Sequence, residues 1–250
     1  MDKFHIMQYW YAYIYDKHET EQGEAQDILA LLETPPQNIL EVACGSGRIA
    51  IPLARAGHNV TGFDIDEYAL ARIPQKADGL NNFKYFAANA LEDVWPVDFD
   101  VVVISGNLLV NIITKGDYTA AQEMLIKKAA ESAKPGGYLY LDFTCIVNWQ
   151  DVKTSEERVI FEGTDDAGTY GRFIYVGGKY NHEARMDISQ RRYEIKPKNS
   201  DAFEIITESV KHFPALQQVK CWLEKYGWEI KWHSPIIDKT FHAKIWAKRV

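Results

Sequence analysis

The stretch that decides the fold is Ile39-Leu40-Glu41-Val42-Ala43-Cys44-Gly45-Ser46-Gly47-Arg48. An apolar run ends beside an acid and passes at once into a glycine-rich turn, which is typical of a buried strand followed by a helix. Gly45 and Gly47 allow the backbone to turn sharply and a ligand to approach it closely. A second apolar run, residues 60–63, ends at Asp64. The two runs predict neighbouring parallel strands with a nucleoside pocket at their carboxyl ends, where Asp64 accepts hydrogen bonds from ribose hydroxyls.

The glycine loop alone has two interpretations. Read from Gly45 to Ala50, it also fits a dinucleotide fingerprint with alanine in the third place. Glu41 argues against that interpretation, because a carboxylate beside the loop repels a pyrophosphate and suits a cationic or zwitterionic ligand. A nicotinamide-dependent dehydrogenase is therefore kept as a rival hypothesis.

Further segments follow in a characteristic order: Asn89-Ala90, Phe99-Asp100-Val101-Val102-Val103 and Lys134-Pro135-Gly136-Gly137. With the glycine loop and Asp64, this order resembles the class I S-adenosylmethionine-dependent methyltransferases over residues 37–145. The resemblance implies an α/β fold, a doubly wound, seven-stranded, mostly parallel Rossmann-like sheet. It also implies S-adenosyl-L-methionine as cofactor and S-adenosyl-L-homocysteine as product. The predicted enzyme moves a methyl group to a nitrogen, or an oxygen, of a small-molecule acceptor, as glycine/sarcosine and amino-sugar N-methyltransferases do.

The resemblance also implies roles for individual residues. Glu41 is expected to orient the loop and face the cofactor's ammonium group, and Ile65 to lie against the adenine. Asn89 stands where the family commonly has an acid that reads the adenine edge, and its amide carbonyl can meet the adenine amine. The predicted cofactor-binding residues are Tyr15, Glu41, Ala43, Gly45, Gly47, Asp64, Ile65, Asn89, Ala90, Leu91 and Ser105. Cys44 is interpreted as a packing residue.

Candidate catalytic residues come from three places. Ser105-Gly106-Asn107-Leu108-Leu109 ends the fourth predicted strand and resembles the Gly-Asn-Ser-Phe segment of glycine N-methyltransferases. There Asn107 either holds the acceptor or caps the next turn. His212 lies where the chain returns to its last helix and is either a general base or a packed histidine. Residues 142–149 contain no arginine where those relatives grip a carboxylate, which argues against free glycine as the acceptor.

The N-terminal segment is the third place, because Tyr11-Ala12-Tyr13-Ile14-Tyr15-Asp16 resembles the Phe-Ala-x-x-Tyr-Asp segment that closes over the cofactor in many small-molecule methyltransferases. Tyr15 is its best candidate contact, and aromatic faces attract a sulfonium or ammonium group. The alternative is a helix that faces a core, which leaves some of these aromatic residues unexplained because they cannot all share one helical face.

Composition and pattern bound the rest. The chain of 250 residues carries a formal charge of −7, which argues against a binder of nucleic-acid phosphates, and its three cysteines have no disulfide or metal-site spacing. We expect a soluble cytoplasmic protein, monomeric or homodimeric, without a membrane partner. The expected segments are an aromatic cap (1–36), a cofactor-binding core (37–150), an antiparallel β insertion that covers the substrate (151–212), and a last helix with two strands (213–250). A methyltransferase of RNA or protein and a non-catalytic S-adenosylmethionine-binding protein are the alternatives.

Overall fold

A computed structural model describes residues 2–18, 23–146, 156–235 and 240–250. Its contacts divide the chain into two compact units. The first unit, called the small unit here, comprises residues 1–21 and 150–211, and the second, the core unit, comprises residues 22–149 and 212–250. None of the described helices is both long enough and apolar enough to span a bilayer.

The core unit is built on a seven-stranded sheet with the order β10-β11-β5-β4-β1-β2-β3. Strands β3, β2, β1, β4 and β5 are parallel, whereas β11 runs antiparallel between β5 and β10. The strands are β1 (Asn38–Val42), β2 (Asn59–Asp64), β3 (Phe83–Ala87), β4 (Phe99–Ile104), β5 (Ala133–Ile146), β10 (Trp228–His233) and β11 (Thr240–Arg249). The predicted seven-stranded, mostly parallel sheet is confirmed.

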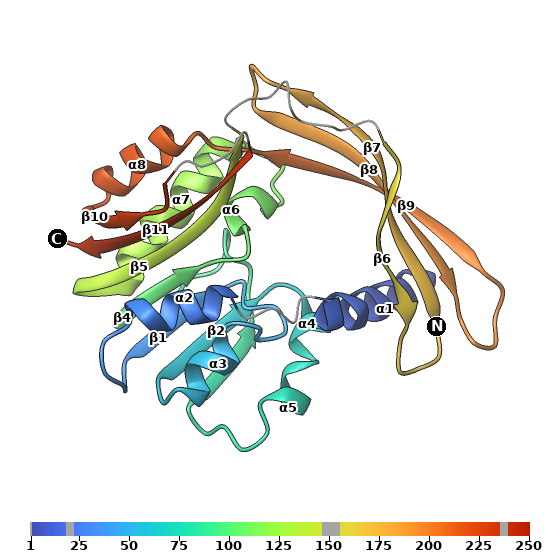
Figure 1. The fold of residues 1–250 in the computed structure, drawn as a ribbon, viewed down its shortest axis with the longest axis horizontal. Coiled ribbons are helices and arrows are strands. Elements are labelled where there is room, and N and C mark those ends of the chain that lie inside the picture. The colour runs from blue at the N-terminus through green and yellow to red at the C-terminus, as the bar shows by residue number, and fades with distance from the viewer. Residues whose placement is uncertain (1, 19–22, 147–155, 236–239) are drawn as a thin grey trace. The chain divides into compact units, whose positions relative to one another are not determined.

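Helices cover both faces of this sheet, so the central strands are apolar on both sides (Figure 1). Helices α7 and α8 supply the core on one face, and helices α2, α3, α4 and α5 supply it on the other. The helices of this unit are α2 (Gly23–Leu31), α3 (Ala50–Arg55), α4 (Glu67–Leu70), α5 (Ile73–Lys76), α6 (Leu108–Asn111), α7 (Tyr118–Ser132) and α8 (Leu216–Lys225).

Residues 67–76 form two short helices, α4 and α5. Pro74 occupies the first turn of α5, and its ring nitrogen cannot donate the hydrogen bond that would continue α4. Asp66 caps α4, because its side chain accepts hydrogen bonds from the backbone amides of Tyr68 and Ala69.

The segment Lys134-Pro135-Gly136-Gly137 opens β5 as a bulge. Phe99 pairs with Ala133 and Val101 pairs with Tyr138, so the four residues of β5 between these two pairs have no partner in β4. A Cβ at Gly137 would lie 3.0 Å from the carbonyl oxygens of Asp100 and Lys134. This part of the motif therefore shapes the amino end of the sheet, away from the glycine loop.

The small unit is a four-stranded antiparallel sheet, β6-β7-β8-β9, with helix α1 (Lys3–His18) packed on it (Figure 1). The strands are β6 (Arg158–Thr164), β7 (Tyr170–Asn181), β8 (Met186–Lys196) and β9 (Phe203–His212), all after β5 in the chain, as expected for an insertion. Trp10 is fully buried, and its indole N–H donates to the carbonyl of Gly163 at 2.9 Å. Tyr11 packs edge-on against Phe173 and Tyr193.

We expect Gly171→Ala to destabilise the small unit, because a Cβ there would lie 2.5 Å from the Trp10 ring and 2.8 Å from Ile195. Overpacking of this kind costs roughly 1–3 kcal/mol. Thermal unfolding followed by tryptophan fluorescence measures the loss. Gly23→Ala is the matched control, since a Cβ at Gly23 meets nothing within 4 Å. Equal stability of the two variants would contradict the packing of Trp10 on β7.

Candidate functional site

The glycine loop lies at the carboxyl end of β1 and has a strained backbone. Ala43, Gly45 and Gly47 have φ values of 58°, 53° and 81°. Gly45 and Gly47 adopt the left-handed region without a steric cost, whereas the Cβ of Ala43 makes this conformation strained. Residues with such strained backbones cluster at functional sites. The loop is tied down by the Cys44 amide, which donates to the carbonyl of Phe63 at 3.0 Å. The two glycines thus have the conformation that the sequence predicted.

Cys44 is a packing residue in this loop. Its side chain is buried, and a Cβ at Gly62 would lie 2.8 Å from its sulfur. Burial raises the pKa of the Cys44 thiol, and the neighbouring carboxylates of Glu41 and Asp64 raise it further. A thiol that stays protonated is a poor nucleophile, so the interpretation of Cys44 as packing is consistent with its surroundings.

Asp64 ends β2 beside this loop. Its Oδ2 accepts a hydrogen bond from the Gly45 amide at 2.7 Å, and its Oδ1 accepts one from the Asp66 amide at 2.8 Å. Burial raises the pKa of Asp64, although these amides favour its charged form. Each carboxylate oxygen keeps a further lone pair for a hydroxyl donor. Ile65 follows with 67% of its surface exposed, a large apolar side chain next to the carboxylate.

Glu41 is the most perturbed acid of the site. Its exposed fraction is only 4%, and its Oε2 has no hydrogen-bond partner among the described residues. Burial raises the pKa of Glu41 from an ordinary 4.5 to about 8, against the opposing effects of Arg48 and the Ala50 amide. A buried, unpaired carboxylate oxygen is costly unless a ligand supplies a cation or a donor.

Arg48 is a functional candidate that the sequence reasoning missed. It joins the glycine loop to α2 through Nη1, which lies 2.6 Å from Oε2 of Glu24. Its Nη2 would lie 3.8 Å from a Cβ at Gly106, in the loop after β4. Arg48 therefore places a cation between the ends of β1 and β4. Its position directly after Gly47 was the available signal.

The turn after β3 contains Asn89, Ala90 and Leu91. Oδ1 of Asn89 accepts a hydrogen bond from the Leu91 amide at 2.9 Å, so this oxygen caps the turn. The carbonyls of Ala90 and Leu91 bind the Lys128 ammonium at 3.0 and 2.8 Å. The adenine-reading role of these residues stays a prediction. If Asn89 serves it, the oxygen must share its lone pairs with Leu91.

A polar network joins the ends of β4 and β5. The buried Asp142 carboxylate accepts hydrogen bonds from the Ser105 hydroxyl, from the Asn107 amide at 2.9 Å and from the Gly106 amide at 3.3 Å. The Asn107 side chain faces Thr144: Oδ1 accepts from the Thr144 amide at 2.7 Å and Nδ2 donates to Oγ1 at 3.0 Å. Ser105 and Asn107 thus share Asp142 as a hydrogen-bond partner, and the Asn107 side chain helps to position this loop.

Asn107 does not cap α6 with its side chain. It has a left-handed backbone with φ of 67° and the amide contacts to Thr144 described above. Its predicted contact with the acceptor therefore depends on the second hydrogen of the amide nitrogen and on the remaining oxygen lone pair.

His242 completes the network from β11, the strand next to β5. Its Nε2 lies 3.4 Å from Oδ1 of Asp142, and its Nδ1 lies 3.4 Å from Oγ1 of Thr144. The side chain is 41% exposed, whereas that of Asp142 is 1% exposed. Sequence reasoning missed His242, Asp142 and Thr144, because residues 142 and 242 meet only through the pairing of β5 with β11.

His212, the predicted general base, is buried. Its Nδ1 lies 2.7 Å from Oε1 of Gln122 on α7, and Gln122 Nε2 donates to the His212 carbonyl at 3.0 Å. These contacts suit the packed histidine that was the alternative. Tyr15 belongs to the small unit, on α1 beside Tyr11 and Phe161, whereas the glycine loop belongs to the core unit. Its roles toward cofactor and acceptor stay predictions.

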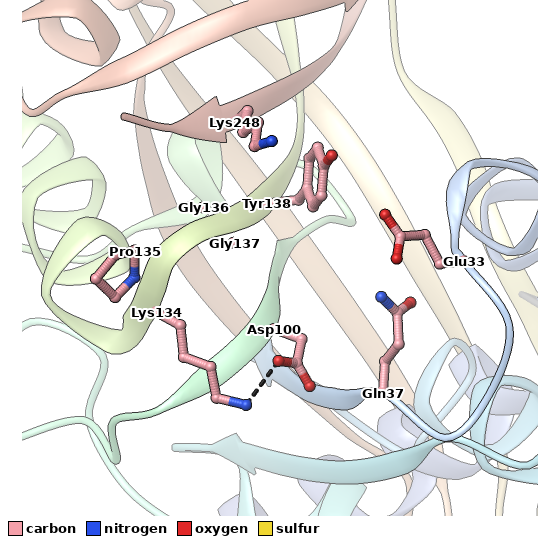
Figure 2. Close-up of a pocket in the computed structure, with 9 residues that line it drawn as sticks. All are labelled: Glu33, Gln37, Asp100, Lys134, Pro135, Gly136, Gly137, Tyr138 and Lys248. Atoms are coloured by element: carbon pink, nitrogen blue, oxygen red, sulfur yellow. Dashed lines mark hydrogen bonds and ion pairs between the residues drawn. The ribbon is translucent and has the colours of Figure 1, made fainter.

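A separate cavity of about 200 Å³ lies at the amino ends of β4 and β5 (Figure 2). Figure 2 shows Lys134 and Asp100 paired across it, with Nζ 2.6 Å from Oδ1. Asp100 also accepts from the Asn38 amide at 2.8 Å, and these cationic and amide donors hold the pKa of Asp100 low against the opposing effect of burial. The charged groups of this cavity therefore mainly hold β1, β4 and β5 together, at the edge of the sheet opposite the glycine loop.

Comparisons with known proteins agree with this geometry. Residues 39–137 match the family described as "Methyltransferase domain". A ubiquinone biosynthesis O-methyltransferase of Pseudomonas fluorescens is 29% identical over 107 residues, which cover 42% of this chain and 43% of the relative. The putative methyltransferase YqeM of Bacillus subtilis is 34% identical over 106 residues, covering 42% and 41%. The matched part is thus about two fifths of these curated relatives' length.

Solved structures match over nearly the whole chain. DesVI of Streptomyces venezuelae has a TM-score of 0.71 at 13% identity, covering 95% of this chain and 97% of that one. The sugar N-methyltransferase KedS8 from Streptoalloteichus has a TM-score of 0.71 at 13% identity, covering 92% and 87%. An S-adenosylmethionine-dependent methyltransferase from Clostridium acetobutylicum also has a TM-score of 0.71, at 14% identity and 96% and 97% coverage.

The strand order, the site at the carboxyl ends of β1 and β2 and these likenesses define a class I methyltransferase fold. Residues 39–137 are, more particularly, the part of the chain that matches the methyltransferase family. The fold and the class expected from the sequence are confirmed.

We expect the stability of the protein to fall as the pH rises from about 5 toward 8, in part because of Glu41. The folded protein keeps the Glu41 proton up to pH about 8, whereas the unfolded chain loses it near 4.5. Unfolding then releases a proton, which a higher pH favours, and one pKa unit is worth about 1.4 kcal/mol.

Urea unfolding at pH 5 and at pH 8 measures this effect. Glu41→Gln should make the free energy of unfolding less dependent on pH. Relative to the wild type, the free energy of unfolding of the variant should therefore rise by roughly 1–4 kcal/mol between pH 5 and pH 8. Glu92→Gln, at an exposed glutamate, is the matched control. A Glu41→Gln protein with the wild-type pH dependence would show that Glu41 is not the buried proton carrier.

Proposed function

We propose that this chain is an S-adenosylmethionine-dependent methyltransferase that methylates a nitrogen, or an oxygen, of a small-molecule acceptor. The observation that carries the proposal is the orphaned Glu41 carboxylate oxygen beside a glycine loop held in a left-handed conformation. An ammonium group would supply the donor that this oxygen lacks and would stabilise the ionised form of Glu41, whereas a phosphate group would disfavour that form.

The residues present fit the cofactor along its whole length. At its amino-acid end, Glu41 would face the ammonium group and Arg48 the carboxylate, two opposite charges for a zwitterion. Asp64 would accept from the ribose hydroxyls, and the exposed Ile65 would cover one face of the adenine. Glu41 lies in β1, Arg48 follows the glycine loop, and Asp64 and Ile65 stand at the end of β2.

When bound, S-adenosylmethionine supplies a sulfonium methyl group that is already reactive toward a nucleophile. The chain therefore has to orient the acceptor, exclude water and accept a proton where the acceptor loses one. Ser105 and Asn107 would shape the acceptor's side of the site, because the Asp142 carboxylate fixes the loop after β4.

A nitrogen acceptor is favoured over oxygen. Structural neighbours described as a sugar N-methyltransferase and as a glycopeptide N-methyltransferase are each matched over 92% of this chain. These matches extend beyond the segment of residues 37–150 that is expected to bind the cofactor. The acidic formal charge of −7 further favours a small acceptor over a nucleic acid.

Calorimetric titration with S-adenosylhomocysteine tests the cofactor assignment. We expect binding by the wild type and at least a roughly tenfold weaker affinity in Asp64→Ala, because a charged hydrogen bond is worth about 1.5–3 kcal/mol. Asp66→Ala is the control for local disturbance, since Asp66 caps α4 and faces no proposed ligand group. NADH, titrated in parallel, should give no heat, and binding of NADH alone would overturn the proposal.

A further inference from the structure

The second polar cluster of the core unit surrounds His242, and the proposed cofactor contacts do not use it. Four residues form a closed ring of contacts. Asp142 accepts a hydrogen bond from the Asn107 backbone amide, and the Asn107 side chain binds Thr144. Thr144 contacts His242, and His242 in turn contacts Asp142. The ring links β4, β5 and β11 at their shared edge. Its carboxylate is buried, and its imidazole is the exposed member.

The sheet order places this ring on the acceptor's side of the cofactor. Strands β2 and β3, which carry the proposed ribose and adenine contacts, lie on one side of β1, and β4, β5 and β11 lie on the other. A ligand that begins over β2 and β3 and passes the glycine loop directs its other end toward β4. His242 lies farther along this edge with its side chain 41% exposed, because β11 pairs with β5 through His242 and Thr144.

The hydrogen-bonding capacities in the ring favour one tautomer. Asp142 already accepts from three donors of the loop after β4, so a proton on Nε2, which faces it at 3.4 Å, suits this arrangement best. The Nδ1 lone pair then faces the Thr144 hydroxyl at 3.4 Å. That distance is long for a hydrogen bond, and such a contact is easily exchanged for a better donor.

We propose that His242 is the general base of the proposed methyl transfer, with Asp142 as its positioning partner. The proposal rests on the proposed function and adds the proton acceptor that it lacks. The Nδ1 lone pair takes a proton from the acceptor nitrogen, whose own electron pair is thereby freed for attack. The ring becomes an imidazolium, the Asp142 carboxylate stabilises it, and the proton then leaves to water.

The same comparison argues against His212 as the base. The His212 ring is buried and bound to Gln122 on α7, whereas His242 is half-exposed at the carboxyl edge. A base must reach the proton that it abstracts, within hydrogen-bond distance or through one water. Of these two histidines, His242 meets that condition.

The test uses three variants of the full chain: His242→Gln, His242→Ala and, as matched control, His233→Gln. His233 lies on the adjacent strand β10, is exposed and contacts Lys220 and the Ser234 carbonyl. Calorimetry with S-adenosylhomocysteine comes first and should give wild-type affinity in all three. Methyl transfer is then followed as S-adenosylhomocysteine formation with ethanolamine, benzylamine and glucosamine as acceptor probes.

We expect His242→Gln to lower kcat by roughly 10²-fold or more with an unchanged KM for S-adenosylmethionine, since general-base catalysis contributes about 10²–10⁴-fold. Added imidazole should restore part of the rate in His242→Ala, and His233→Gln should match the wild type. A His242→Gln enzyme within threefold of wild type, with cofactor binding intact, overturns the His242 assignment alone. A wild type that binds no S-adenosylhomocysteine overturns the proposed function and this proposal with it.

A second readout needs no turnover and decides the assignment if none of the probes reacts. Long-range proton–nitrogen NMR spectra of ¹⁵N-histidine-labelled protein, bound to S-adenosylhomocysteine, identify the ring tautomer of His242. The His242→Gln spectrum assigns its signal among the seven histidines. A neutral ring protonated at Nε2 supports the proposal, because Nδ1 is then free to accept a proton. A neutral ring protonated at Nδ1 overturns it.

Discussion

The buried carboxylate of Asp142 is the constraint on which the carboxyl edge of the sheet depends. A charge without solvent must be satisfied by donors, and the nearest ones are the Ser105 hydroxyl and the amides of Gly106 and Asn107. For those amides to point at one carboxylate, the chain must turn back after β4, and both Gly106 and Asn107 adopt positive φ values. The end of β4, the orientation of Asn107 and the place of Thr144 all follow from this single group.

Two further carboxylates at the same edge are held under opposite conditions. Asp64 accepts two backbone amides, which stabilise its charge, whereas Glu41 has an oxygen with no partner among the described residues and keeps its proton up to pH about 8. Buried Glu41 therefore destabilises the protein without ligand, and a cationic ligand group would offset that destabilisation. A site that costs free energy when empty is one that binding can stabilise, and this is the general trade between stability and function.

The sequence could predict what is local and not what pairing brings together. The glycine loop and Asp64 are each encoded within a few residues, and the structure has them where the patterns indicated. Asp142 and His242 are a hundred residues apart in number and become neighbours only because β11 inserts between β5 and β10. Predicting them would have required the register of β5 with β11, which no turn or short motif specifies.

The same limit applies to His212, whose role as a base stays a prediction. Its place at the return from β9 to α8 follows from chain order, but whether its ring faces solvent depends on α7, which contributes Gln122 from ninety residues earlier. A buried histidine with both a ring nitrogen and its own carbonyl bound to one glutamine serves packing and chain connection. An exposed histidine supported by a buried carboxylate is the arrangement that proton transfer requires, because the carboxylate orients the ring and stabilises the charge that the ring acquires. By that criterion, His242 on β11 is the residue at this edge that we propose for proton transfer.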